Sequence, residues 1–61
     1  MLGREELNEK LGEYYKKFVD GGLSAADAQA KVRGAMGNLT AEQLLEPANQ
    51  SQVFATLDAA K

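Results

Sequence analysis

The stretch REELNEKLGEYYKKFV, residues 4–19, decides the fold. Its apolar side chains recur at steps of four, three and four, and this spacing places them on one narrow stripe of an α-helix. The positions between them are mostly Glu, Lys, Asn and Gly, so the helix needs to be covered on one side only. The stripe consists of Leu7, Leu11, Tyr14 and Phe18, with Tyr15 at its border.

Charged residues in this stretch favour the same helix. Glu6 with Lys10, and Glu13 with Lys17, stand four positions apart in the favourable order of Glu before Lys, which predicts a stabilising pair in each case. Gly12 lies away from the stripe and weakens a helix interior by about 1 kcal/mol relative to Ala. Either the helix tolerates this glycine or something packs closely against it.

Two more helix starts follow along the chain. The pair Gly21-Gly22 is typical of a left-handed helix end, and Ser24 then stands at the cap position of a second helix. Thr40 with Gln43 forms a capping box, in which each side chain bonds the backbone of the other, and predicts a third start.

Proline marks the last helix. Pro47 cannot continue the third helix but suits the first turn of a new one, and either Asn49 or Ser51 is available as its cap. No stretch shows the alternation of a strand, and Ile is absent. The sequence therefore predicts one all-α domain, residues 1–61, folded as a small bundle of three to four short helices at about 4–20, 24–36, 40–46 and 48–60.

Composition limits what can reinforce so short a chain. It has 61 residues and neither Cys nor His, so disulfides are impossible and a zinc site lacks its usual ligands. Oligomerisation or docking on a partner is the reinforcement that remains. The net charge is −2, and residues 34–60 carry no Lys or Arg, which argues against a nucleic-acid surface in that half.

The same composition argues against catalysis. Without His and Cys, the commonest general base and the best side-chain nucleophile are missing, and a small chain has difficulty enclosing a pocket of about 300 Å³ or more. We therefore expect no enzyme and no catalytic, cofactor-binding or metal-binding residues. No apolar run approaches the roughly 18 residues of a membrane span, and the N-terminus lacks a signal-peptide pattern. We expect a soluble protein, cytoplasmic or within a larger assembly, with no membrane partner.

The apolar stripe has two interpretations. It is either the inner face of a small monomeric bundle or a contact seam, because its spacing is also that of a heptad. The last segment likewise either completes the core or offers a helix to a groove elsewhere. Tyr15 is the best single candidate for a residue that faces a partner. The predicted protein-binding residues are Leu7, Leu11, Tyr14, Tyr15, Phe18, Val53, Phe54 and Leu57.

Three functional hypotheses follow. The first is a non-enzymatic protein–protein interaction module, a small structural or accessory subunit of a larger assembly such as a virion component or an enzyme complex, bound to another protein or to itself. The alternative is a small acidic regulatory or inhibitor protein that binds a basic target surface. Nucleic-acid binding ranks third. It would need the cations of the first two helices to cluster in a hairpin, namely Lys16, Lys17, Lys31 and Arg33.

Overall fold

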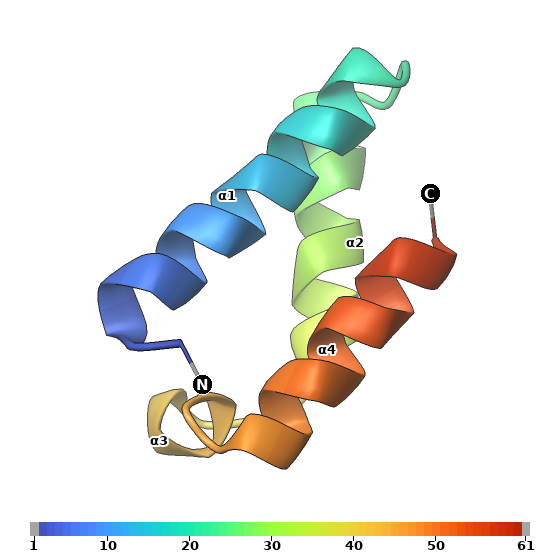
Figure 1. Ribbon diagram of the computed structural model, residues 1–61. Coiled ribbons are helices and arrows are strands. Elements are labelled where there is room, and N and C mark those ends of the chain that lie inside the picture. The colour runs from blue at the N-terminus through green and yellow to red at the C-terminus, as the bar shows by residue number, and fades with distance from the viewer. Residues whose placement is uncertain (1, 61) are drawn as a thin grey trace.

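Four helices account for most of the chain in the computed structural model, which describes residues 2–60 (Figure 1). Over these residues there is no strand, so the predicted all-α class is confirmed. The boundaries lie within two residues of the predicted ones. The helices are α1 (Arg4–Asp20), α2 (Ala25–Met36), α3 (Ala41–Leu44) and α4 (Pro47–Ala59).

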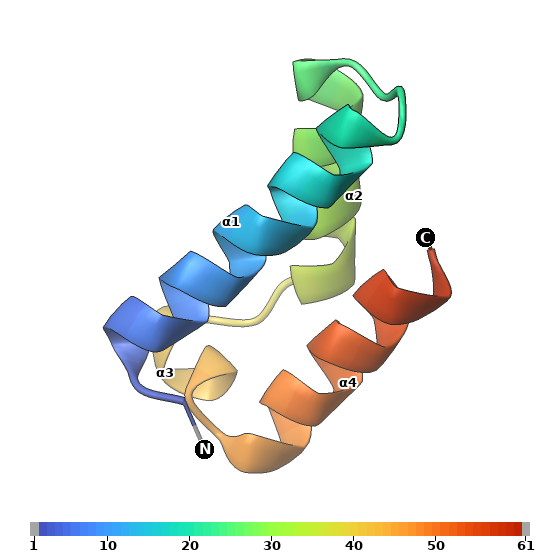
Figure 2. The ribbon, with the colours of Figure 1, turned by 45° about the horizontal axis from the view of Figure 1, so that its top comes forward.

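The three long helices run up, down and up again. α2 turns back along α1 as a hairpin, α3 lies at the end opposite the α1–α2 turn, and α4 returns in roughly the direction of α1 (Figures 1 and 2). α2 packs against both α1 and α4, and α3 packs against α4. The molecule is elongated, with principal extents of 31 × 19 × 17 Å.

The predicted starts of α2 and α3 are confirmed by their caps. The Ser24 hydroxyl accepts a hydrogen bond from Asp27 N at 3.2 Å. In the Thr40 capping box both bonds are present, because Gln43 N donates to Thr40 Oγ1 at 3.1 Å and Thr40 N donates to Gln43 Oε1 at 2.9 Å. Gly22 follows α1 with φ +112°, a backbone conformation that favours glycine.

The start of α4 differs from the expectation. Pro47 is its first residue, as predicted, but the cap position is Glu46, and neither Asn49 nor Ser51 caps the helix. Because the helix begins at the proline, Asn49 already lies inside the first turn. Its side-chain amide instead donates to Gln43 O at 2.8 Å and to Glu46 Oε2 at 3.1 Å, which fixes the junction between α3 and α4.

The core lies where α1, α2 and α4 meet. Its centre on α2 is Ala28, which is fully buried, and a side chain this small lets the neighbouring helices approach α2 closely. Leu57 on α4 is 1% exposed. The buried cluster comprises Tyr14, Phe18, Ala28, Val32, Val53 and Leu57, and the half-buried residues packed against it are Leu11, Leu23, Ala35, Met36, Leu39, Leu44 and Phe54.

Candidate functional site

The structure places most of the predicted binding residues inside the molecule. The stripe of α1 and the apolar face of α4 pack into one core, so the last helix completes the core of this chain. Tyr15 is the exception, since 36% of it is exposed. Of the eight predicted residues, Leu7, Tyr14, Phe18, Val53 and Leu57 are buried, and Leu11 and Phe54 are half-buried.

Tyr14 links α1 to α4 through both its ring and its hydroxyl. Its ring stacks on that of Phe54, with centroids 6.0 Å apart and planes 18° apart. Its hydroxyl donates a hydrogen bond to Asp58 Oδ1 at 2.6 Å. This hydrogen bond, followed by burial and by the negative charges of Asp58 and Glu13, raises the pKa of Tyr14 to about 12. The phenol therefore stays protonated at neutral pH and serves as a hydrogen-bond donor.

Two lysines of α1 also contact these rings. Lys10 Nζ lies 5.0 Å from the ring centroid of Phe54, and Lys17 Nζ lies 5.5 Å from that of Tyr14. The carboxylate of Glu6, the predicted partner of Lys10, instead accepts a hydrogen bond from Gly3 N at 2.7 Å. Lys10 and Lys17, which the helical spacing paired with glutamates, thus lie over the aromatic rings between α1 and α4.

Gln50 is a structural residue that the sequence reasoning missed. It is 4% exposed. Both the oxygen and the nitrogen of its side-chain amide bond the backbone of Leu2. Leu2 N donates to Gln50 Oε1 at 3.0 Å, and Gln50 Nε2 donates to Leu2 O at 2.9 Å. No local pattern identifies such a contact, because the two residues are 48 positions apart.

An apolar patch lies on the outside of α1. Tyr15 and Val19, 36% and 38% exposed, stand one turn apart. Gly12 precedes Tyr15 by three positions and Val19 by seven, a spacing that places the three residues on one helix face. A Cβ added at Gly12 meets no atom of the chain within 4 Å, so within residues 2–60 nothing packs closely at this point. We call Gly12, Tyr15 and Val19 the outer patch.

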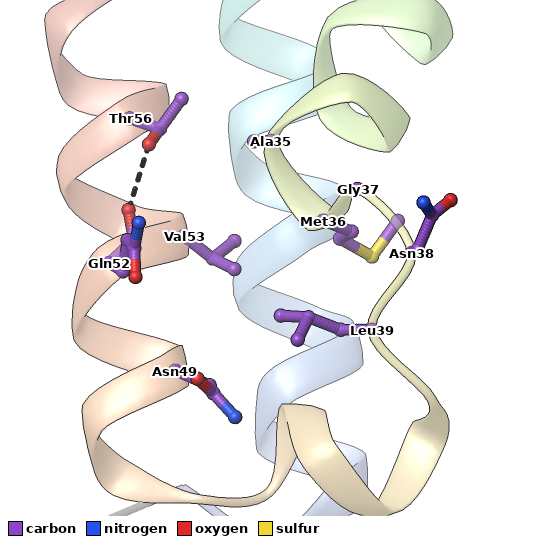
Figure 3. A pocket seen from close by; sticks show the side chains of 9 residues that line it. All are labelled: Ala35, Met36, Gly37, Asn38, Leu39, Asn49, Gln52, Val53 and Thr56. Carbon is purple, nitrogen blue, oxygen red and sulfur yellow. Dashed lines mark hydrogen bonds between the residues drawn. The ribbon is translucent and has the colours of Figure 1, made fainter.

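One cavity lies between the end of α2 and the middle of α4. Its volume is about 260 Å³. Figure 3 shows Leu39 and Val53 turned toward one another, with Met36 beside them, whereas Asn38 points away. The polar side chains on the α4 side are Asn49, Gln52 and Thr56, and Thr56 Oγ1 donates to Gln52 O at 2.9 Å. Among the described residues, no charged one lines this cavity. Its apolar side chains belong to the core or pack against it.

A second cavity, of about 370 Å³, lies near the α1–α2 turn. Its volume is larger than the roughly 300 Å³ that we expected so short a chain to have difficulty enclosing. The cavity is open to solvent on one side. We call it the lysine cavity, because the charged residues that line it are both lysines. Its lining consists of Lys17, Phe18, Gly21, Leu23, Lys31 and Ala60.

The lysine cavity brings together two of the four cations considered for a nucleic-acid surface, Lys17 and Lys31. Residues 2–60 contain no group of three or more acidic, His or Cys side chains placed to hold a metal ion. Within the same residues no helix combines the length and the apolar character that crossing a membrane requires. Comparisons of the chain with protein-family models, with curated proteins and with solved structures find no match.

Proposed function

We propose that this chain is a non-enzymatic protein–protein interaction module, a small structural or accessory subunit of a larger assembly, which meets its partner protein through the outer patch. The observation that carries the proposal is the exposure of Tyr15 and Val19. Among residues 2–60 these are the two large apolar side chains that the fold leaves exposed. Tyrosine suits a contact surface because it offers a large apolar area with a polar tip.

Gly12 supports the same surface. A glycine in a helix interior costs about 1 kcal/mol relative to alanine, and no contact within the described chain requires it, since the space beside it is open. A bare backbone next to Tyr15 lets the backbone of a partner approach closely. The outer patch thus combines an exposed aromatic side chain with a stretch of helix backbone that no side chain of residues 2–60 covers.

The remaining predicted binding residues have a supporting role in this proposal. Phe18, Val53 and Leu57 hold α1 against α4 and so fix the direction in which the outer patch points. Phe54 and Leu11 are half-buried and lie at the margin of the core. The contact surface is therefore narrower than the eight residues suggested by the sequence.

Co-purification tests the proposal. The tagged chain is isolated with its bound proteins from its natural source, and the ratio of each partner to the chain is measured by mass spectrometry. The double variant Tyr15→Ala/Val19→Ala should lose the partner at least tenfold, whereas Gln29→Ala/Ser51→Ala, a pair of exposed residues on α2 and α4, should retain it. Circular dichroism establishes that both variants keep their helix content.

The dependence of binding on salt distinguishes this proposal from the alternative, a small acidic regulatory or inhibitor protein. A partner held by an apolar patch stays bound at high ionic strength, whereas a basic target held by the acidic second half is released. If every partner survives loss of Tyr15 and Val19, the outer patch is not the contact. If the partners leave in salt with both side chains intact, an acidic inhibitor is the better description.

A further inference from the structure

We infer that the lysine cavity binds the α3 end of a second copy of this chain, so that copies associate head to tail. The inference extends the proposed function by a contact of the chain with itself, and it does not involve the outer patch. It rests on two complementary features, one near the α1–α2 turn and one at the α3–α4 turn. These two turns lie at opposite ends of the molecule (Figures 1 and 2).

The first feature is the lysine cavity. Its apolar floor is formed by Phe18, which is buried, and by Leu23, which is half-buried. Lys17 and Lys31, on different helices, are exposed at this floor. Among residues 2–60, no carboxylate lines the cavity. The carboxylate of Asp58, two residues before Ala60, accepts the hydrogen bond of Tyr14. An apolar group accompanied by negative charge therefore fits the cavity better than a neutral or a basic one.

The second feature is the turn between α3 and α4. Leu44 packs against the core, whereas its neighbour Leu45 is half-buried and lies outside the core. Glu42 stands one helical turn before Leu45, and Glu46 directly follows it; both are exposed. We call Glu42, Leu45 and Glu46 the acidic knob. The knob presents one apolar side chain accompanied by two carboxylates.

The knob and the cavity carry charges of opposite sign and equal number, and each has an apolar centre. They cannot meet within one copy, because α3 lies at the end opposite the α1–α2 turn (Figure 1). A contact between unlike surfaces of two copies leaves one cavity and one knob free at the ends of the pair. Further copies can then add, so that the product is an open chain of molecules.

The expected association is weak. One leucine and two solvent-exposed ion pairs make a contact far below the roughly 1,200 Å² that stable complexes bury. In sedimentation equilibrium from micromolar to millimolar concentration, the average mass should therefore rise continuously, without a plateau at the dimer. Helix content by circular dichroism should stay constant, because the core is complete within one copy.

Charge reversal supplies the decisive test. The cavity variant Lys17→Glu/Lys31→Glu and the knob variant Glu42→Lys/Glu46→Lys should each associate about tenfold more weakly than the wild-type chain. An equimolar mixture of the two should regain association, since each then offers the surface that the other accepts. Leu45→Ala should weaken association about tenfold as well, with little change in salt dependence.

Two controls separate the contact from general effects. Lys16→Glu/Arg33→Glu makes the same change in net charge as the cavity variant but lies outside the lysine cavity, so it should associate like the wild-type chain. Tyr15→Ala/Val19→Ala should also leave self-association unchanged, which keeps this inference distinguishable from the proposed function.

Several results would overturn the inference. A mass that stays at the monomer value at millimolar concentration is one, and a mixture of charge variants that fails to associate is another. Equal weakening by Lys16→Glu/Arg33→Glu would assign the effect to net charge alone. In NMR titrations of the labelled chain with unlabelled copies, shifts at Leu23 without shifts at Leu45 would mean that something other than the acidic knob enters the cavity.

Discussion

Replacing Tyr14 by Phe should destabilise the protein by about 1.5 kcal/mol. The change removes the hydroxyl that donates to Asp58 at 2.6 Å but keeps the ring stacked on Phe54. Hydrogen bonds to charged groups contribute about 1.5–3 kcal/mol, and the lower end applies because Asp58 is exposed and its carboxylate regains water. A domain of this length has a total stability of only about 3–9 kcal/mol. The melting temperature should therefore fall by several degrees.

The same hydrogen bond predicts a loss of stability at alkaline pH. The pKa of Tyr14 is raised to about 12 in the folded chain, against about 10 for tyrosine in an unfolded chain. The raised pKa means that this stabilisation is fully present below pH of about 10 and is lost as the pH rises toward about 12. Urea unfolding followed by circular dichroism at neutral pH and at several alkaline pH values should show the decline. The wild-type chain and Tyr14→Phe are compared in a Tyr15→Phe background, so that titration of Tyr15 does not contribute to the difference.

A double-mutant cycle with Asp58→Ala isolates the pair from other effects of each substitution. The coupling energy between Tyr14→Phe and Asp58→Ala should equal most of the loss seen in the single Tyr14 variant. Unfolding of Tyr14→Phe at the same urea concentration as the wild-type chain would refute the reasoning. So would an alkaline decline above pH of about 10 that persists unchanged in Tyr14→Phe.

Four further substitutions test other parts of the fold by urea unfolding. Gly12→Ala should stabilise the chain by about 1 kcal/mol, because the space beside Gly12 is open, whereas Gly22→Ala should destabilise it because of the positive φ. Gln50→Leu should cost about 1–2 kcal/mol and speed hydrogen exchange at the Leu2 amide, since both hydrogen bonds to Leu2 are lost. Leu57→Ala should cost about 2–5 kcal/mol, enough to unfold much of the protein, because Leu57 is 1% exposed.

Local signals were sufficient to predict the helices. The caps at Ser24 and Thr40, and the proline at the start of α4, each depend on residues within one turn, where the sequence itself brings the partners together. The cap of α4, expected at Asn49 or Ser51, was wrong, because the cap position is Glu46. Asn49 is a good capping residue, but Pro47 starts the helix before it.

The candidate site was predicted less well, because its contacts join distant parts of the chain. Tyr14 and Asp58 are 44 positions apart, and nothing in the spacing of either residue indicates the other. Lys10 and Lys17 had glutamates at helical spacing, yet they lie over rings that only the packing of α4 brings into place. Tyr15 was predicted to face outward from its position at the border of the stripe, and the structure leaves it exposed.

The hydrogen bonds between Gln50 and Leu2 have a consequence for the order of folding. They close a loop of 48 positions, and the closure entropy of such a loop opposes them by about 3–4 kcal/mol. Two hydrogen bonds of about 1 kcal/mol each do not offset that entropy. They become favourable only after the α1–α2 hairpin has formed and α4 has packed on it, which already brings the ends of the loop together. This contact is therefore among the last to form during folding and among the first to open.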